Sequence, residues 1–140
     1  MLELLDFNRR YGMLLLVENV GVHGSSLFTP EEFTSFLNDM PSETGYLLDI
    51  GHAHVNRWDI CKMISDLKGR LYAVHLHDNH GTSDEHLPMG EGTVDWDSVF
   101  EAIRQSGDGM HLVLEYDAGT PLEKLAEGKK ILQKEFGITD

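Results

Sequence analysis

The stretch Leu71–Trp96, LYAVHLHDNHGTSDEHLPMGEGTVDW, contains the pattern on which the whole chain is built. It opens with a short apolar run that predicts a buried strand, and His75 stands at the end of that run. A polar loop with Asp84 and His86 follows, and glycines then lead into a predicted helix start. A strand that ends in a histidine, with a loop that returns an Asp and a His, predicts half of a metal site.

The same order of strand and helix occurs four times along the chain. Short apolar segments predict strands at about residues 13–18, 46–49, 71–75 and 111–115. Helical patterns follow, of which the clearest lie at about residues 57–67, 95–105 and 122–136. Thr29, Pro30 and Glu32 predict the capping-box start of another helix. This alternation indicates an α/β fold with a parallel sheet and right-handed crossovers.

The number of units indicates half of a barrel. A closed (β/α)8 barrel usually needs about 250 residues, whereas this chain has 140. Because the sequence opens in a helical pattern, we expect residues 1–140 to be the C-terminal half of a (β/α)8 TIM barrel, a single partial domain of four parallel βα units. No GxGxxG turn follows a predicted strand, which counts against a dinucleotide-binding fold.

The charge balance disfavours nucleic acid as a partner. The chain carries 24 Asp and Glu against 11 Lys and Arg, for a net charge of −13, and nonspecific affinity for nucleic acid comes mainly from Lys and Arg. No apolar run approaches the roughly 20 residues of a membrane span, and the acidic first residues lack the pattern of a signal peptide. Cys61 is the only cysteine, which rules out a thiolate zinc cluster. We therefore expect a cytoplasmic protein without a membrane partner.

One candidate ligand closes each predicted strand, namely Glu18, Asp49, His75 and Glu115. Any one of them alone is as readily explained as a helix cap or a backbone-bonded side chain. The carboxyl ends of barrel strands meet at one face, however, so we expect the four to converge. Three carboxylates and one imidazole suit Mn²⁺, Mg²⁺ or Zn²⁺. His52, Asp84 and His86 are expected in the same cavity, as contacts to substrate or to an additional metal.

These motifs resemble the xylose isomerase-like superfamily of TIM barrels, which includes sugar-phosphate isomerases and epimerases and endonuclease IV, of AP endonuclease family 2. The matching segments cover essentially the whole chain and are Val17–Asn19, Leu48–His52, His75–Asn79, Asp84–His86, Gly90–Gly92 and Val113–Glu115. Resemblance to the epimerase branch implies one divalent metal held by the four strand-end residues. It also implies that Glu18 and Glu115 are an acid/base pair and that His52 hydrogen-bonds a substrate oxygen. The implied reaction is proton transfer next to a metal-polarised carbonyl of a small sugar or sugar phosphate.

The endonuclease IV branch is the alternative. It implies up to three Zn²⁺ ions for phosphodiester hydrolysis, with seven of the ligands in this chain: Glu18, Asp49, His52, His75, Asp84, His86 and Glu115. Asp84 and His86 favour this branch, but it also needs two histidines from strands that precede this segment. The acidic net charge and the sequence of His75–Asn79, HLHDN, favour the isomerase. A metal-binding half-barrel without turnover is a third alternative.

A free half-barrel exposes two sheet edges and part of the barrel interior. We therefore expect homodimerisation, with two halves that complete a barrel. We also expect His77 to pack outside the barrel or to bond the loop. His111 is expected to be structural, because it starts its strand at the end opposite the site, and Trp58 and Trp96 are expected to be packing residues.

Overall fold

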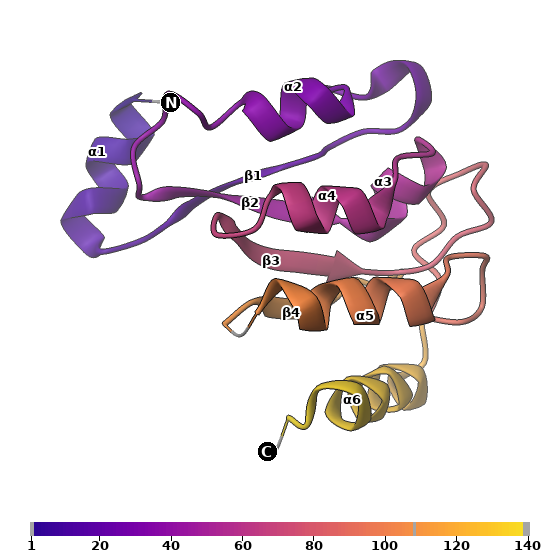
Figure 1. Cartoon of the computed structure of the whole chain (residues 1–140). Coiled ribbons are helices and arrows are strands. Elements are labelled where there is room, and N and C mark those ends of the chain that lie inside the picture. The colour runs from indigo at the N-terminus through magenta and orange to yellow at the C-terminus, as the bar shows by residue number, and fades with distance from the viewer. Residues whose placement is uncertain (1, 108, 139–140) are drawn as a thin grey trace.

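A four-stranded parallel sheet forms the centre of the protein, in a computed structural model that describes residues 2–107 and 109–138 (Figure 1). Its strands are β1 (Leu15–Glu18), β2 (Thr44–Asp49), β3 (Leu71–Leu76) and β4 (His111–Leu114). They lie side by side in the order of the chain, and each pair of neighbours is parallel. All four strand C-termini therefore lie at one end of the sheet.

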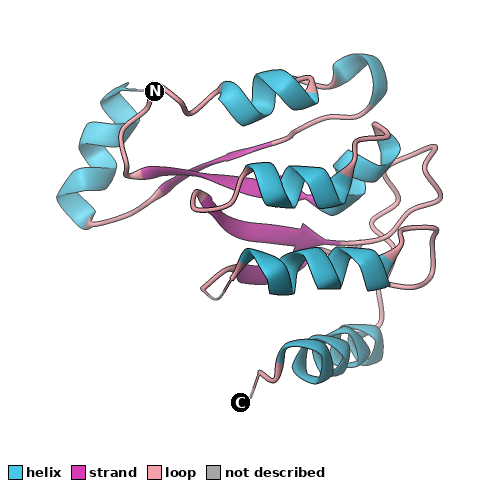
Figure 2. Cartoon of the chain, in the orientation of Figure 1, coloured by secondary structure: helices cyan, strands magenta, loops and turns pink. Residues whose placement is uncertain are grey.

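Helices alternate with these strands, as Figure 2 shows. α1 (Leu2–Tyr11) precedes β1, and the short η1 (His23–Ser25) and α2 (Pro30–Ser35) lead from β1 to β2. α3 (Ile50–Val55) and α4 (Ile60–Asp66) lead to β3, α5 (Trp96–Ser106) leads to β4, and α6 (Leu122–Phe136) follows. The predicted fold, four βα units of a half-barrel, is confirmed. Within the described residues, every helix is too short or too polar to span a bilayer.

The helices cover one face of the sheet and form the core with it. Tyr46, Leu48, Val74 and Leu76 of the strands are buried against Phe33, Ile64, Phe100 and Ile103 of α2, α4 and α5. Each such side chain contributes about 1.5–3 kcal/mol when fully buried. Trp58 packs against this core, and its ring centre lies 5.9 Å from that of Phe33. The opposite face, which would line the interior of a closed barrel, carries the polar strand-end residues.

Side-chain caps fix where the helices begin. At α2, Thr29 and Glu32 form the predicted capping box, with N–H···O distances of 3.2 and 2.8 Å. The helix predicted at about residues 57–67 corresponds to α4, which begins three residues later, at Ile60, whereas the preceding helix α3 was not predicted. Asp49 caps α3 and Asp59 caps α4, and between these helices Arg57 has a φ of 58°, a left-handed conformation that interrupts a helix.

The strand bounds differ slightly from the prediction. β1 begins at Leu15, where its pairing with Thr44 of β2 begins, and Met13 and Leu14 are exposed (46% and 48%) although they belong to the apolar run. β2 begins two residues earlier than predicted, at Thr44, and β4 ends at Leu114, directly before Glu115. At the opposite end of the sheet, the guanidinium of Arg70 donates hydrogen bonds to backbone carbonyls that include those of Pro41 and Thr44.

Candidate metal centre

The C-terminal ends of the strands bring four predicted residues together. Glu18 and Asp49 are the last residues of β1 and β2, and each can present one ligand atom within 4.8 Å of one on His75 of β3. Glu115 follows β4 directly, and its Oε2 lies 2.6 Å from Nδ1 of His75. We call these four residues the first cluster.

The first cluster fits a divalent metal ion. His75 Nδ1 and Glu115 Oε2 are buried and lie 2.6 Å apart as an ion pair, but neither atom has a hydrogen-bond partner among the described residues. Buried polar atoms are nearly always satisfied, so two such atoms at the meeting point of four strands favour a bound group that completes them. Carboxylate oxygens with one imidazole are ligands that Mn²⁺, Mg²⁺ and Zn²⁺ accept.

Asp49 is the most constrained member of the cluster, with an exposure of 0%. The amide of Asn19 donates to the backbone oxygen of Asp49 at 3.0 Å and accepts from its backbone N–H at 2.7 Å. The backbone N–H of His52 donates to Asp49 Oδ1 at 2.6 Å. Asn19 therefore joins the ends of β1 and β2, a role that the sequence analysis missed. Its only signal is its position directly after the strand-end Glu18.

The charges of the first cluster act on one another. Burial would raise the pKa of Asp49, but the neighbouring imidazoles of His75 and His77 outweigh it and hold that pKa well below its ordinary value. The pKa of His75 is raised, first by Asp49, although burial opposes this. Burial, followed by the charge of Asp49, raises the pKa of Glu18. Asp49 is thus held ionised, whereas Glu18 is easier to protonate than an ordinary glutamate.

A second cluster adjoins the first and consists of His52, Asp84 and His86, which can present ligand atoms within 4.8 Å of one another. Nε2 of His52 and Nε2 of His86 lie 3.1 and 3.2 Å from the same oxygen, Asp84 Oδ2. His86 Nδ1 lies 3.0 Å from the backbone oxygen of Glu115, an acceptor that fixes the hydrogen on Nδ1, so Nε2, beside Asp84 Oδ2, is the nitrogen that could bind a metal. His52 Nδ1 lies 3.5 Å from Glu18 Oε1, so the two clusters share a boundary.

His77 is fully buried between the clusters, where it contacts Asp49, so the prediction that it packs outside the barrel is wrong. The alternative, a bond to the loop, is replaced by a ring stack on the loop residue His86. Residues two apart along a strand point to the same side, and His77 continues the side of His75 just beyond β3. Its Nε2 lies 3.0 and 3.1 Å from the two carboxylate oxygens of Asp49. Its ring stacks on His86, with ring centres 4.0 Å apart and an interplanar angle of 10°. The i, i+2 spacing of His75 and His77 already indicates in the sequence that both side chains lie on the same side.

Asp78, the next residue, has a structural role. Its buried carboxylate accepts hydrogen bonds from the backbone N–H groups of Gly90 (2.9 Å) and Val94 (3.1 Å) and from Trp96 Nε1 (2.8 Å). Asp78 therefore organises the glycine-containing loop and the start of α5. Trp96 also packs against the core, as predicted. Asp78 lies in one of the segments that resemble the family, but it shapes the loop and belongs to neither cluster.

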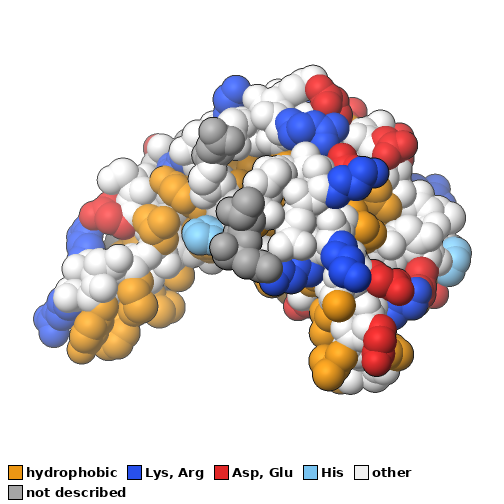
Figure 3. All heavy atoms as spheres, turned by 90° about the horizontal axis from the view of Figure 1, so that it is seen from below, with side chains coloured by type: hydrophobic (Ala, Val, Ile, Leu, Met, Phe, Trp, Pro, Cys, Tyr) orange, Lys and Arg blue, Asp and Glu red, His pale blue; other side chains and the backbone are white. Residues whose placement is uncertain are grey.

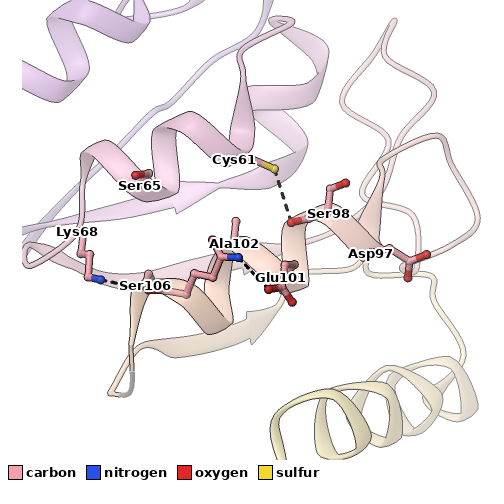
Figure 4. Close-up of a pocket in the computed structure, with 9 residues that line it drawn as sticks. Cys61, Ser65, Lys68, Asp97, Ser98, Glu101, Ala102 and Ser106 are labelled. Atoms are coloured by element: carbon pink, nitrogen blue, oxygen red, sulfur yellow. Dashed lines mark hydrogen bonds between the residues drawn. The ribbon is translucent and has the colours of Figure 1, made fainter.

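A groove of about 690 Å³ between α4 and α5 lies away from both clusters, on the outer surface (Figure 4). Cys61 donates to the backbone oxygen of Ser98 at 3.6 Å, and Lys68 donates to that of Gln105 at 3.1 Å. These contacts join the two helices to each other. The polar side chains that converge on one point lie in the two clusters at the C-terminal ends of the strands and not in this groove.

Comparison with known proteins agrees with the half-barrel fold. The sequence matches the family of xylose isomerase-like TIM barrels over residues 1–135, and the chain belongs to this family. The uncharacterized protein MJ1311 of Methanocaldococcus jannaschii is 32% identical over 113 residues, which are 77% of this chain and 39% of that protein. The chain thus spans about two fifths of the length of this curated relative.

Two solved structures extend the comparison. A D-tagatose 3-epimerase-like protein is 27% identical and superposes with a TM-score of 0.82 over 96% of this chain and 51% of its own. The TTHB071 protein from Thermus thermophilus, soaked with ZnCl2, is 26% identical, with a TM-score of 0.66 over 91% of this chain and 48% of its own. Half of each barrel therefore corresponds to the four units described above.

Proposed function

We propose that this chain carries the metal-binding half of a sugar or sugar-phosphate isomerase/epimerase. The observation that carries the proposal is the convergence of Glu18, Asp49 and His75 within 4.8 Å, with Glu115 2.6 Å from His75. The likeness to an epimerase-like protein supports the same reaction class. The four residues would hold one divalent ion, Mn²⁺, Mg²⁺ or Zn²⁺, and the zinc-soaked relative supports zinc among these.

In this proposal the two glutamates move the proton. Glu18 and Glu115 lie at the ends of β1 and β4, the two outer strands, with Asp49 and His75 between them. They therefore reach a substrate from opposite sides, so that one removes the proton beside the carbonyl and the other returns it. His52, at the edge of the first cluster, would orient a substrate oxygen. A bound divalent ion supplies Lewis-acid polarisation of the carbonyl.

The first test is metal content per chain by elemental analysis, for the wild type and Glu115→Ala. About one equivalent in the wild type that is reduced in the variant is the expected result. Deuterium exchange in D2O then tests the chemistry, with ketohexoses and their phosphates followed by proton NMR. We expect exchange at the carbon beside the carbonyl and its loss in Glu18→Gln and Glu115→Gln. A metal-loaded chain without exchange on any of these sugars would contradict the isomerase and leave a metal-binding half-barrel.

A second candidate is a multi-zinc phosphodiesterase like endonuclease IV, favoured by the second cluster. His52, Asp84 and His86 meet within 4.8 Å, and two imidazoles with one carboxylate are a zinc-type ligand set. The metal count separates the candidates, because two or more zinc ions per chain would favour this one. Cleavage of DNA that contains an abasic site is then the activity to measure.

We also propose that two copies of this chain pair through the open edges of the half-barrel. β1 and β4 are the outer strands of the sheet, and eight strands close a barrel of this type. Beside these edges, Leu14 and Val113 are 48% and 40% exposed. Figure 3 shows further hydrophobic side chains at the left end of the molecule. Phe7 and Tyr11 of α1 are also exposed. A dimer in sedimentation analysis is expected at micromolar concentration, and a folded monomer would contradict the proposal.

A further inference from the structure

We propose that His77 is a positioning residue that holds Asp49 in place as a metal ligand and joins the two clusters. This inference rests on the proposed metal site and deepens it. His77 is distinct from the seven residues that the sequence singled out for the site. It reaches one cluster through a hydrogen bond and the other through its ring.

The hydrogen bond to Asp49 defines the tautomer of His77. An ionised carboxylate only accepts hydrogen bonds, so Nε2 of His77 must carry the hydrogen that lies between it and the two Asp49 oxygens, which are 3.0 and 3.1 Å from Nε2. Both side chains have 0% exposure, so solvent does not compete for this contact. Hydrogen bonds of this kind to a ligand carboxylate fix its orientation toward the metal.

The ring of His77 is held on two sides. It stacks on His86 of the second cluster at 4.0 Å. On another side it lies against Gly51, where an added Cβ would come within 1.9 Å of His77 Cε1. The second residue of the helix that Asp49 caps therefore leaves room for the imidazole that contacts Asp49.

The remaining nitrogen points toward the second cluster. His77 Nδ1 and Asp84 Oδ1 are buried, have no hydrogen-bond partner among the described residues, and lie 3.9 Å apart. With the hydrogen on Nε2, His77 Nδ1 is an acceptor like Asp84 Oδ1, so a single water that donates to both atoms would connect Asp49 through His77 to Asp84. His77 thus stands where a change at one cluster reaches the other.

Two substitutions separate positioning from packing. His77→Gln keeps an N–H donor for Asp49 and loses the ring, whereas His77→Phe keeps the ring and the stack and loses the donor. We expect Mn²⁺ affinity, measured by calorimetry, to fall about 10–100-fold in His77→Phe, the usual loss for an outer-shell partner, and to stay within about threefold in His77→Gln. A packing role predicts the reverse order. The same two substitutions at His111, exposed at the start of β4, are the matched controls and should change nothing.

A measurement on the wild type covers the case in which a variant does not fold. In metal-free protein labelled with ¹⁵N, long-range ¹H–¹⁵N correlation distinguishes the two tautomers of His77. The Nε2–H form is expected, and the Nδ1–H form would overturn the proposal, as would equal Mn²⁺ affinity in the wild type and folded His77→Phe. Wild-type protein that binds no metal would instead contradict the proposed function. The tautomer is measured without metal, so it tests the contact between His77 and Asp49 separately from metal binding.

Discussion

Asp49 and Asp78 are both fully buried carboxylates near the C-terminal end of the sheet, and both have a pKa below the ordinary value. Their surroundings differ. Asp78 faces backbone N–H groups and the indole of Trp96, which satisfy it completely by uncharged donors. Asp49 faces imidazoles and further carboxylates, and beside it the buried atoms His75 Nδ1 and Glu115 Oε2 form an ion pair but no hydrogen bond among the described residues.

This difference separates structure from function more clearly than burial or charge does. A buried carboxylate whose oxygens are satisfied by fixed donors contributes to stability. A buried carboxylate among other titratable groups, with polar atoms left over, is typical of a site that awaits a partner. Both residues belong to segments that match the family, so sequence similarity alone assigns them equal weight.

Removal of the Asp78 carboxylate should have the largest effect on stability. Asp78→Ala leaves four donors without their acceptor, namely Trp96 Nε1 and the backbone N–H groups of Asn79, Gly90 and Val94. We expect the free energy of unfolding to fall by about 3 kcal/mol, since each buried group left without a partner costs about 1–3 kcal/mol. Urea denaturation followed by circular dichroism measures this. Asp39→Ala, at an exposed position, is the control. Metal affinity of the folded Asp78 variant should stay within about threefold of wild type, and a larger loss would remove the distinction between the two carboxylates.

Neutralisation of Asp49 should give the opposite pattern. Asp49→Asn keeps an acceptor oxygen for His52 and His77 but removes the charge that a cation requires. We expect Mn²⁺ affinity to fall by at least about 100-fold, the upper range for an outer-shell partner, because a direct ligand matters at least as much. Calorimetric titration measures the affinity and thermal melting tests the fold. Unchanged affinity would mean that Asp49 is structural, like Asp78.

Two glycines allow a finer comparison. An Ala Cβ at Gly51 would lie 1.9 Å from the His77 ring, and one at Gly92 would lie 2.3 Å from Asp78 Oδ1. Overpacking of this kind costs about 1–3 kcal/mol, although Ala in a helix such as α3 would otherwise stabilise by about 1 kcal/mol. Both variants should therefore melt at lower temperature, but only Gly51→Ala should also lose metal affinity. Gly24→Ala, with nothing within 4 Å of the added Cβ, is the control.

The smallest expected effect is on the pH dependence of stability in metal-free protein. Burial would raise the pKa of Asp78, but Trp96 and the backbone donors outweigh it, so the folded pKa lies below the ordinary 3.8. Its contribution is therefore present above about pH 4 and is lost as the pH falls further, with a slope of at most about 1.4 kcal/mol per pH unit. Asp78→Asn should flatten the acid limb of a stability–pH curve measured by denaturation. An unchanged acid limb would mean that Asp78 binds its proton equally in both states.

Much of the fold and the convergence of the strand-end residues could be predicted from the sequence. Parallel strands in chain order bring their last residues to one edge, so the convergence of Glu18, Asp49 and Glu115 could be predicted without knowledge of side-chain packing. The contacts around these residues could not be predicted, because they depend on how the side chains pack. Asn19 is recognised only by its pairing with Asp49, and the break between α3 and α4 depends on the φ of Arg57. The place of His77 depends on the space left by Gly51.

The order of the strands across the sheet is the same as their order in the chain. Each strand after the first therefore pairs with the strand synthesised immediately before it, so every βα unit can dock as it leaves the ribosome, without waiting for a distant segment. Contacts between successive units favour rapid folding, and domains form from the N-terminal side during synthesis. On this route Glu115 is the last residue of the proposed metal site to arrive, so the four strand ends converge only when β4 has been added.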